Sequence, residues 1–349
     1  MYTIEGIDYA HEGLCLLNMM ATGGSERWCE EIRSRQSRCD LSALPLDALM
    51  DAVRRAEKVV SVPAELLKRD FRPLEDDADM NLAHACVQLT QCRARAGSMG
   101  EREQRTREYL ARLVELENQK PLSNEEVIAL LAQTQASDKL KWFCVEAMND
   151  AARRAQPTLD AIAQAETALM DEAAVLEPMA EQCVAQLLQA WTRDGYEAHL
   201  ERVGIRLDEQ PVSVYPSPIN CFALQVSEKT PLYEDGLVEY IGICVETIAS
   251  HNERREWSDE ALYRMVHAMD DKNRMLILSL LREGPKIGRE LCQGTKLTPA
   301  TISHHMNELF HSGLVLVEKQ GNSIEYRLCA ANMEQGLRQL LERFCEKSE

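Results

Sequence analysis

The stretch that decides the fold spans residues 294–328 and reads GTKLTPATISHHMNELFHSGLVLVEKQGNSIEYRL. Thr298 suits an N-cap, and Pro299 suits the first helical position because its φ is fixed and it lacks an N–H. We therefore expect a helix over residues 299–312, closed by Gly313 in the left-handed conformation. Two short strands should follow, at residues 314–318 and 324–328, joined by a turn at residues 320–323.

The predicted helix has one apolar face and one polar face. A surface helix without a functional constraint usually carries Glu and Lys on its outer side, whereas a helix that enters the major groove needs short hydrogen-bonding side chains. An ordinary amphipathic helix is the alternative interpretation. The apolar side comprises Ile302, Met306, Leu309 and Phe310, and the polar side comprises Ala300, Thr301, His304, Asn307 and His311.

The residues before this stretch complete a motif. Residues 271–281 have the spacing of an apolar helix that Glu283-Gly284-Pro285 ends, and residues 286–293 predict a further short helix that Gly294 ends. Two short helices joined by a tight turn form a helix-turn-helix, and the two strands would follow it as a wing. The sequence thus predicts a winged helix-turn-helix.

Three segments of this motif resemble the ArsR/SmtB winged-helix transcriptional regulators. They are DDKNRMLIL at residues 270–278, LTPATISHHM at 297–306 and SGLV at 312–315, and together they cover about the last quarter of the chain. Members of that family are homodimeric repressors that leave operator DNA when an effector binds. The resemblance therefore implies a homodimer that binds double-stranded DNA through the helix from Pro299. Two-fold symmetry then implies an inverted-repeat operator.

The metal-binding positions of that family are not preserved here. Its metal sensors carry a Cys-x-Cys pair before the recognition helix, where this chain has Ile287 and Arg289. A second family site needs Asp and His on the last helix, and residues 332–349 contain neither. We therefore expect no metal site, no cofactor, and a non-metal effector that is a small molecule or a protein. Cys292 is expected to be a small buried hydrophobe.

Length and composition predict more than one domain. The chain has 349 residues and 45% hydrophobic content, which suffices for two or three cores. We expect a mainly α protein with a helical body at 1–195, for sensing or oligomerisation. A small β-containing connecting unit should follow at 196–257, because Pro residues there separate segments rich in β-branched and aromatic side chains. The winged helix-turn-helix would occupy 258–349.

Within the predicted body, most patterns are helical. Ser123 begins a capping box, and Trp142 with Phe143 is expected in the core. His11 is an isolated imidazole, so we interpret it as a surface or cap residue. The longest helical pattern covers residues 157–191, which would either pair two subunits along a seam or lie across the helices of its own chain.

The charge distribution confines DNA contact to one end of the chain. The net charge is −18, yet residues 272–328 carry eight Lys or Arg and five Asp or Glu, a net charge of +3. The rest of the chain therefore carries −21. Because such a body repels phosphate, only the mildly basic C-terminal module is expected to meet DNA.

Other signals exclude several classes of protein. No run of eighteen apolar residues and no secretory signal occurs, so we expect a cytoplasmic protein without membrane contact. Twelve cysteines without a C-x-x-C motif fit reduced core thiols, with a redox pair of Cys86 and Cys92, or Cys29 and Cys39, as the alternative. Nucleotide-binding and hydrolase motifs are absent, so we predict no enzyme and no catalytic residue.

The predicted function is that of a sequence-specific DNA-binding regulator, a homodimeric repressor. A protein-interaction scaffold that uses its winged helix for protein contacts is the alternative, followed by an enzyme activity hidden in the body. His305 is expected to be an internal hydrogen-bonding residue. Contacts to bases and nearby phosphates are assigned to Thr298, Ala300, Thr301, Ser303 and His304, backbone phosphate contacts to Lys296, Lys319, Asn322 and Arg327, and dimer contacts to Met333, Leu337, Leu340, Leu341 and Phe344.

Overall fold

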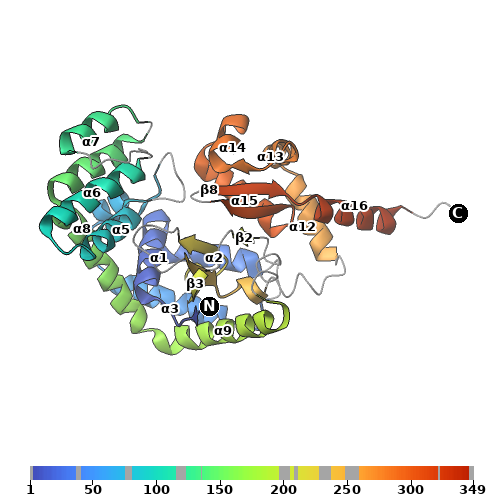
Figure 1. Ribbon diagram of the computed structural model, residues 1–349. Coiled ribbons are helices and arrows are strands. Elements are labelled where there is room, and N and C mark those ends of the chain that lie inside the picture. Colours follow the sequence, from blue (N-terminus) through green and yellow to red (C-terminus); the bar gives the residue numbers. More distant parts are fainter. Residues whose placement is uncertain are drawn as a thin grey trace.

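The structure is a computed structural model that confirms a mainly α chain (Figure 1). A helical body, drawn in blue to green, lies beside a C-terminal unit, drawn in orange to red. We call this unit, residues 259–345, the reader. Among the described helices, none combines the length and apolar character needed to cross a bilayer. The described residues are 3–36, 41–74, 81–114, 123–134, 136–195, 205–207, 211–227, 237–247, 259–320 and 323–345.

The body contains two hydrophobic cores. One gathers side chains from α1, α2, α3 and α9, and the other lies among α5, α6, α7 and the first part of α8. The capping box at Ser123 is confirmed at the start of α7. The helices are α1 (Tyr9–Thr22), α2 (Gly24–Gln36), α3 (Leu46–Val59), α4 (Ala64–Leu66), the π-helix η1 (Leu67–Phe71), α5 (Leu82–Ala94), α6 (Met99–Leu113), α7 (Asn124–Leu131), α8 (Asp138–Met170) and α9 (Ala173–Asp194).

The long helix predicted at 157–191 is broken at Asp171 and Glu172. Its first half instead continues α8, which passes through Pro157 and has its kink at Asp150. Asp150 Oδ1 accepts a hydrogen bond from the N–H of Arg153 at 3.0 Å, so Asp150 caps the second segment of α8. The apolar side chains of the predicted seam are buried in the first core of the same chain, namely Ile162, Leu169, Leu176, Met179, Cys183, Leu187 and Trp191. These seven side chains therefore pack across their own body and are not available to a coiled coil.

A small sheet packs on the same core as α1. Its strand order is β1-β3-β5-β4, with β3 parallel to both β1 and β5, and β4 antiparallel to β5. Because β1 comes from the N-terminus, the strands predicted in 196–257 share a sheet and a core with the body. The boundaries at 195 and 257 stay a prediction. The strands are β1 (Thr3–Ile4), β3 (Pro211–Ser217), β4 (Leu224–Ser227) and β5 (Leu237–Gly242).

The reader has the predicted winged helix-turn-helix order. Its core holds Met265, Leu291, Ile302, Leu309 and Leu314 among others. The wing strands β7 and β8 are longer than predicted, because Gln320 pairs with Ser323 and only two residues separate the strands. The elements are α12 (Asp259–Met269), α13 (Lys272–Arg282), β6 (Lys286–Ile287), α14 (Gly288–Thr295), α15 (Pro299–His311), β7 (Val315–Gln320), β8 (Ser323–Leu328) and α16 (Ala330–Phe344).

The short helix before α15 differs from the prediction at both ends. Lys286 and Ile287 form strand β6 against β8, so α14 begins only at Gly288. Gly294 lies inside α14, and Lys296 adopts the left-handed conformation that ends it, with φ of 60°. A Cβ at Gly294 would lie 2.8 Å from Leu280 Cδ1. The glycine therefore gives room to the tip of the Leu280 side chain on α13 and does not terminate α14.

The structure corrects the prediction for Trp142 and supports the one for the cysteines. Trp142 is exposed, whereas its neighbour Phe143 is buried, because adjacent residues on a helix point to different sides. The described cysteines are all free thiols and most of them are buried, as expected for reduced core residues. Cys39 lies outside the described residues. Cys292 is partly rather than fully buried.

A buried ion pair ties η1 to α8. Arg154 donates to both carboxylate oxygens of the fully buried Asp70, with Nη2–Oδ1 and Nη1–Oδ2 distances of 2.7 and 3.1 Å. Thr158 Oγ1 also donates to Oδ2 at 2.6 Å. Burial raises the pKa of Asp70, but hydrogen bonds from Arg69, Arg154 and Thr158 outweigh that effect, so its pKa lies below the ordinary value. The carboxylate is therefore ionised and held in place.

Candidate nucleic-acid interface

The N-terminus of α15 is built by the cap that the sequence predicts. Thr298 Oγ1 accepts a hydrogen bond from the N–H of Thr301 at 3.2 Å, and Pro299 occupies the first helical turn. The hydroxyls of Thr298 and Thr301 also lie 2.8 Å apart. Gly313 follows the helix with φ of +75°, which confirms the predicted left-handed closure. The uncapped N–H groups at this end and the aligned peptide dipoles favour an anion such as phosphate.

The polar face of α15 is open to solvent along its first three turns. Thr298, His304 and Asn307 are exposed, and Thr301 and Ser303 are half-buried. Ala300 is also predicted to contact bases, but its side chain lies outside the described part of the chain. Asn307 was not assigned to DNA, although it lies three residues after His304 on the same exposed face. Its amide offers a donor and an acceptor, the groups that read adenine.

Two of the four residues assigned to backbone phosphates have side chains that the structure describes. Lys296 is exposed at the turn between α14 and α15, and Arg327 is exposed on β8, opposite Leu316. Lys319 lies in β7 next to the tip of the wing. Asn322 lies outside the described residues. The structure thus places two of the four assigned cationic or polar side chains at the surface.

His305 is buried, as expected, but the expectation that it forms hydrogen bonds is wrong within the described residues. Neither ring nitrogen has a partner, and Nδ1 lies 3.9 Å from Asp271 Oδ1. Burial lowers the pKa of His305, while Asp271 acts in the opposite direction. Asp271 is already engaged as the N-cap of α13, where it accepts from the N–H of Arg274. The guanidinium of Arg274 donates to backbone carbonyls of α12, so it is not available to DNA.

The C-terminal end of α15 contacts the body. His311, predicted on the exposed face, is partly covered, and its Nε2 lies 2.7 Å from Arg35 Nη1. Burial lowers the pKa of His311 to about 3, so the neutral ring accepts a hydrogen bond from Arg35. The Arg35 guanidinium also lies over the Phe222 ring, 4.7 Å from its centroid. Sequence reasoning missed this contact because Arg35 and His311 are far apart in the chain.

A strand from the connecting segment joins the wing. β2 (Ile205–Leu207) lies parallel to β7, with Ile205 opposite Val317 and Leu207 opposite Lys319. The sheet order is β2-β7-β8-β6. Among the described residues, the body and the reader therefore meet at the β2–β7 pairing, at the Arg35–His311 contact and where Val317 of β7 packs against the first core of the body. Thr298, His304 and Asn307 of the α15 face stay exposed beside these contacts.

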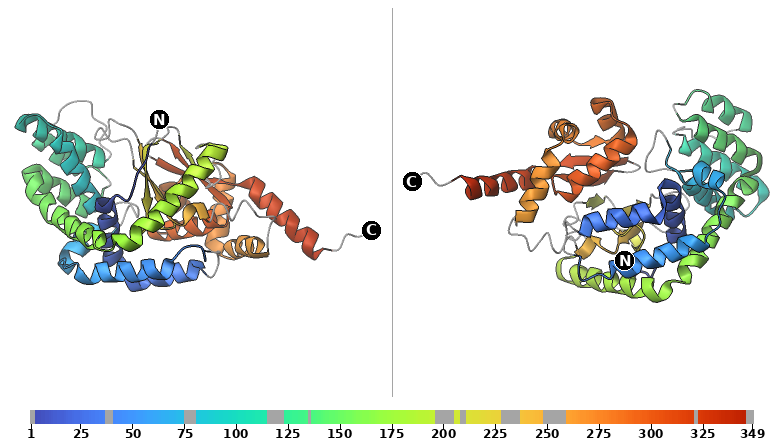
Figure 2. Two further views of the ribbon diagram at one scale, coloured as in Figure 1. Left: turned by 90° about the horizontal axis from the view of Figure 1, so that it is seen from below. Right: turned by 180° about the vertical axis from the view of Figure 1, so that it is seen from behind.

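The residues assigned to dimer contacts divide into two sets. Met333 and Leu340 pack on the core of the reader, whereas Leu337, Leu341 and Phe344 are exposed, Phe344 to 77%. Figures 1 and 2 show that α16 extends away from the rest of the chain. Exposed apolar residues also occur on the neighbouring helix α12, where Tyr263 and Val266 lie at the surface. Exposed apolar side chains therefore occur on both α12 and α16.

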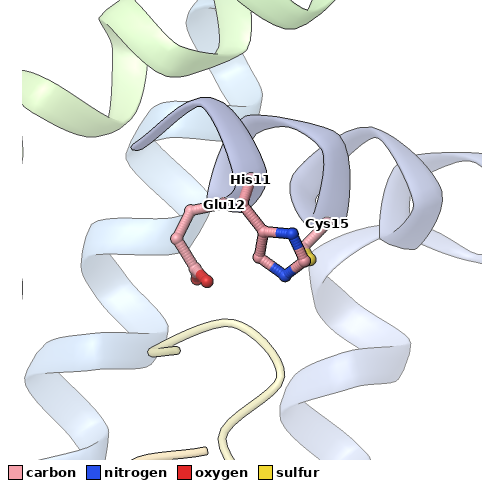
Figure 3. A group of neighbouring side chains, drawn as sticks. All are labelled: His11, Glu12 and Cys15. Atoms are coloured by element: carbon pink, nitrogen blue, oxygen red, sulfur yellow. The ribbon is translucent and has the colours of Figure 1, made fainter. Parts of the chain in front are cut away.

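The body also holds a polar cluster that the sequence analysis missed. His11 is not an isolated surface residue, because it is buried with Glu12 and Cys15 on α1 (Figure 3). The signal was present in the spacing, since His11 and Cys15 lie one helical turn apart. It was not distinctive, because the same spacing occurs on many helices without a ligand.

The fold and the exposed face of α15 define the class of winged helix-turn-helix DNA-binding modules. A family model described as bacterial regulatory protein, arsR family, matches residues 271–316, from the cap of α13 into β7. The resemblance seen in the sequence is thereby confirmed for this segment, whose module is that of a DNA-binding transcription regulator. A comparison with curated proteins finds no match.

Proposed function

We propose that the chain is a homodimeric repressor that recognises an inverted-repeat operator and responds to an effector bound by its helical body. The observation that carries this proposal is the exposed polar face of α15, with Thr298, His304 and Asn307 open to solvent beside a capped helix N-terminus. The acidic body would stay away from the phosphates. We assign the body to sensing or assembly rather than catalysis, and the protein to the cytoplasm, where its DNA is.

Selection of bound genomic fragments tests this function. Purified full-length protein is mixed with fragmented DNA of the producing genome, and the retained fragments are sequenced. We expect enrichment of fragments that contain an inverted repeat with half-sites about 10–10.5 base pairs apart, or a multiple of that spacing. Retention of no DNA, together with poor retention on heparin, would instead favour the protein-interaction scaffold.

Lys319 is expected to contribute to affinity without contributing to sequence preference. Replacing Lys319 with alanine removes one cation next to the wing tip, so binding to operator and to random DNA should weaken alike. The slope of log K against log salt should fall by about one. Titrations at several salt concentrations measure both quantities. A loss confined to the operator would contradict the assignment of Lys319 to phosphate.

The exposed end of α16 is expected to pair two subunits. The double substitution Leu341→Glu and Phe344→Glu should yield a folded monomer, because both side chains are exposed within one chain. Each apolar side chain buried in an interface contributes about 1.5–3 kcal/mol. The introduced glutamates would also repel those of the second subunit, because they carry the same charge. Analytical ultracentrifugation measures the mass, and the matched control Arg338→Glu alters an exposed residue of the same helix. A variant that remains dimeric would place the interface elsewhere.

A further inference from the structure

Three metal-ligating side chains converge near the start of α1. His11, Glu12 and Cys15 each offer one donor atom, and these atoms all lie within 4.8 Å of one another. Cys15 lies four residues after His11 and three after Glu12, so it adjoins both on the helix surface. Figure 3 shows the three side chains leaving α1 on the same side. The distance between His11 Nε2 and Cys15 Sγ is 3.4 Å, short enough for both atoms to bind one ion with bonds of about 2.0–2.3 Å.

All three side chains are buried, and the glutamate is 1% exposed. A buried carboxylate needs specific partners, and Glu12 has them in the loop of residues 217–222 that follows β3. Ser217 Oγ donates to Glu12 Oε1 at 2.5 Å, and the N–H of Ile219 donates to Oε2 at 2.7 Å. Each carboxylate oxygen has a second lone pair, so these bonds fix the group without using up its capacity to bind a cation.

The other two ligands are also held by outer partners. Asn220 Nδ2 donates to Cys15 Sγ at 3.1 Å. The ring of His11 stacks on that of Tyr240, with centroids 3.5 Å apart, and the Tyr240 hydroxyl donates to Asp8 Oδ2 at 2.8 Å. Such second-layer contacts orient metal ligands in proteins. These contacts restrict the movement of the three side chains before an ion binds.

The charges of this set match those of a divalent ion. A carboxylate and a thiolate supply two negative charges, and the neutral imidazole supplies none, so a bound divalent ion leaves no net charge in the buried site.

We propose that His11, Glu12 and Cys15 bind one divalent transition-metal ion of the Zn²⁺ class, with a fourth position open to an exchangeable donor. A thiolate with an imidazole selects such ions over Mg²⁺ and Ca²⁺. The expectation of a non-metal effector rested on the reader alone, at Ile287, Arg289 and the last helix. This donor set lies in the body and is separate from those positions.

The same loop connects this site to α15. The carbonyl of Ile219 accepts a hydrogen bond from Trp28 Nε1 on α2 at 3.1 Å. Two turns further along α2, Arg35 lies over Phe222 and contacts His311 at the end of α15. The route from Glu12 to the reader is therefore a continuous series of contacts within the 217–222 loop and α2. That the ion acts as the effector rests on the proposed function, and it is tested separately from binding.

Titration of full-length protein with cobalt tests the metal site. Reduced protein is freed of metal with a chelator, and CoCl₂ is added while the thiolate-to-cobalt charge-transfer absorption is recorded. We expect saturation at one ion per chain and loss of the band when ZnCl₂ is added. Variants His11→Gln, Glu12→Gln and Cys15→Ser should each weaken binding about tenfold or more. Circular dichroism shows which of the three variants are folded, and only the folded variants are used to judge whether the three residues bind the ion.

Matched controls address the accessible thiols of the reader. Cys292→Ser, Cys329→Ser and Cys345→Ser each remove a thiol that is partly or fully exposed, and all three variants should leave the band unchanged. Absence of a band in the folded wild type, or an unchanged band in Cys15→Ser, would overturn the site.

The regulatory link has its own readout. Operator affinity is measured with ZnCl₂ or with chelator, and we expect a change of about 5–150-fold in the wild type and none in Cys15→Ser. Equal affinities in the wild type would overturn the link. Failure of the metal-free protein to bind any DNA would instead overturn the proposed function, whereas the cobalt titration decides the site in either case.

Discussion

Replacing Asp70 with alanine is expected to lower the free energy of unfolding by about 3–5 kcal/mol. The substitution leaves Arg154, whose side chain is 4% exposed, with a buried charge and without its principal partner. Glu146 Oε2 lies 3.0 Å from Arg154 Nε, but this carboxylate is 37% exposed and compensates weakly. Chemical denaturation, with circular dichroism as the signal, measures the change.

Two further variants separate the ion pair from a general loss of packing. The double substitution Asp70→Ala and Arg154→Met removes both charges, so it should recover part of the lost stability. Glu334→Ala removes an exposed ion pair with Arg338 and should change stability by less than about 1 kcal/mol. A double variant no more stable than Asp70→Ala would contradict the assigned cause.

The contribution of Asp70 should depend on pH in one direction. Its pKa is lower in the folded chain than in the unfolded chain, so the unfolded chain binds the proton more readily. The stabilisation is then fully present above the ordinary pKa of about 3.9 and is lost as pH falls through the folded-state value. The difference in stability between wild type and Asp70→Ala should therefore be constant near neutral pH and shrink in acid.

Replacing His304 with alanine is expected to weaken operator binding by about 1–3 kcal/mol. His304 is exposed on α15, where its ring can contact a base edge. The loss should be specific, so affinity for random DNA should hardly change. His267→Ala is the matched control, because this exposed histidine lies on α12 in the same module. Unchanged operator affinity of the His304 variant in a band-shift titration would remove it from the interface.

The reader could be predicted from sequence because its signals are local. The Thr298-Pro299 pair, Gly313 and the period of the apolar residues each act within a few positions, and they placed α15 correctly. The break at Asp171 and Glu172 carries neither glycine nor proline, so the helical pattern continued across it. Pro157 does not mark the start of a helix as the sequence predicts, because α8 continues through it.

Contacts between distant segments left no such signal. Asp70 and Arg154, like Arg35 and His311, come together only when separate helices pack, and neither pair has a recognisable spacing. The same holds for β2, whose pairing with β7 joins segments about a hundred residues apart. The buried cluster at His11 depends on the 217–222 loop, which the sequence places two hundred residues away. The burial of this cluster therefore could be seen only in the structure.

Methylation interference on a selected operator tests the central claim most directly, which is that α15 enters the major groove. Methyl groups are placed on guanine N7, an atom at the floor of that groove, and protein-bound and free DNA are compared. We predict interference in two patches about 10–10.5 base pairs apart, or a multiple of that spacing, and a weaker pattern at one base of each patch with His304→Ala. Tight binding without interference at any major-groove guanine of the operator would contradict the account.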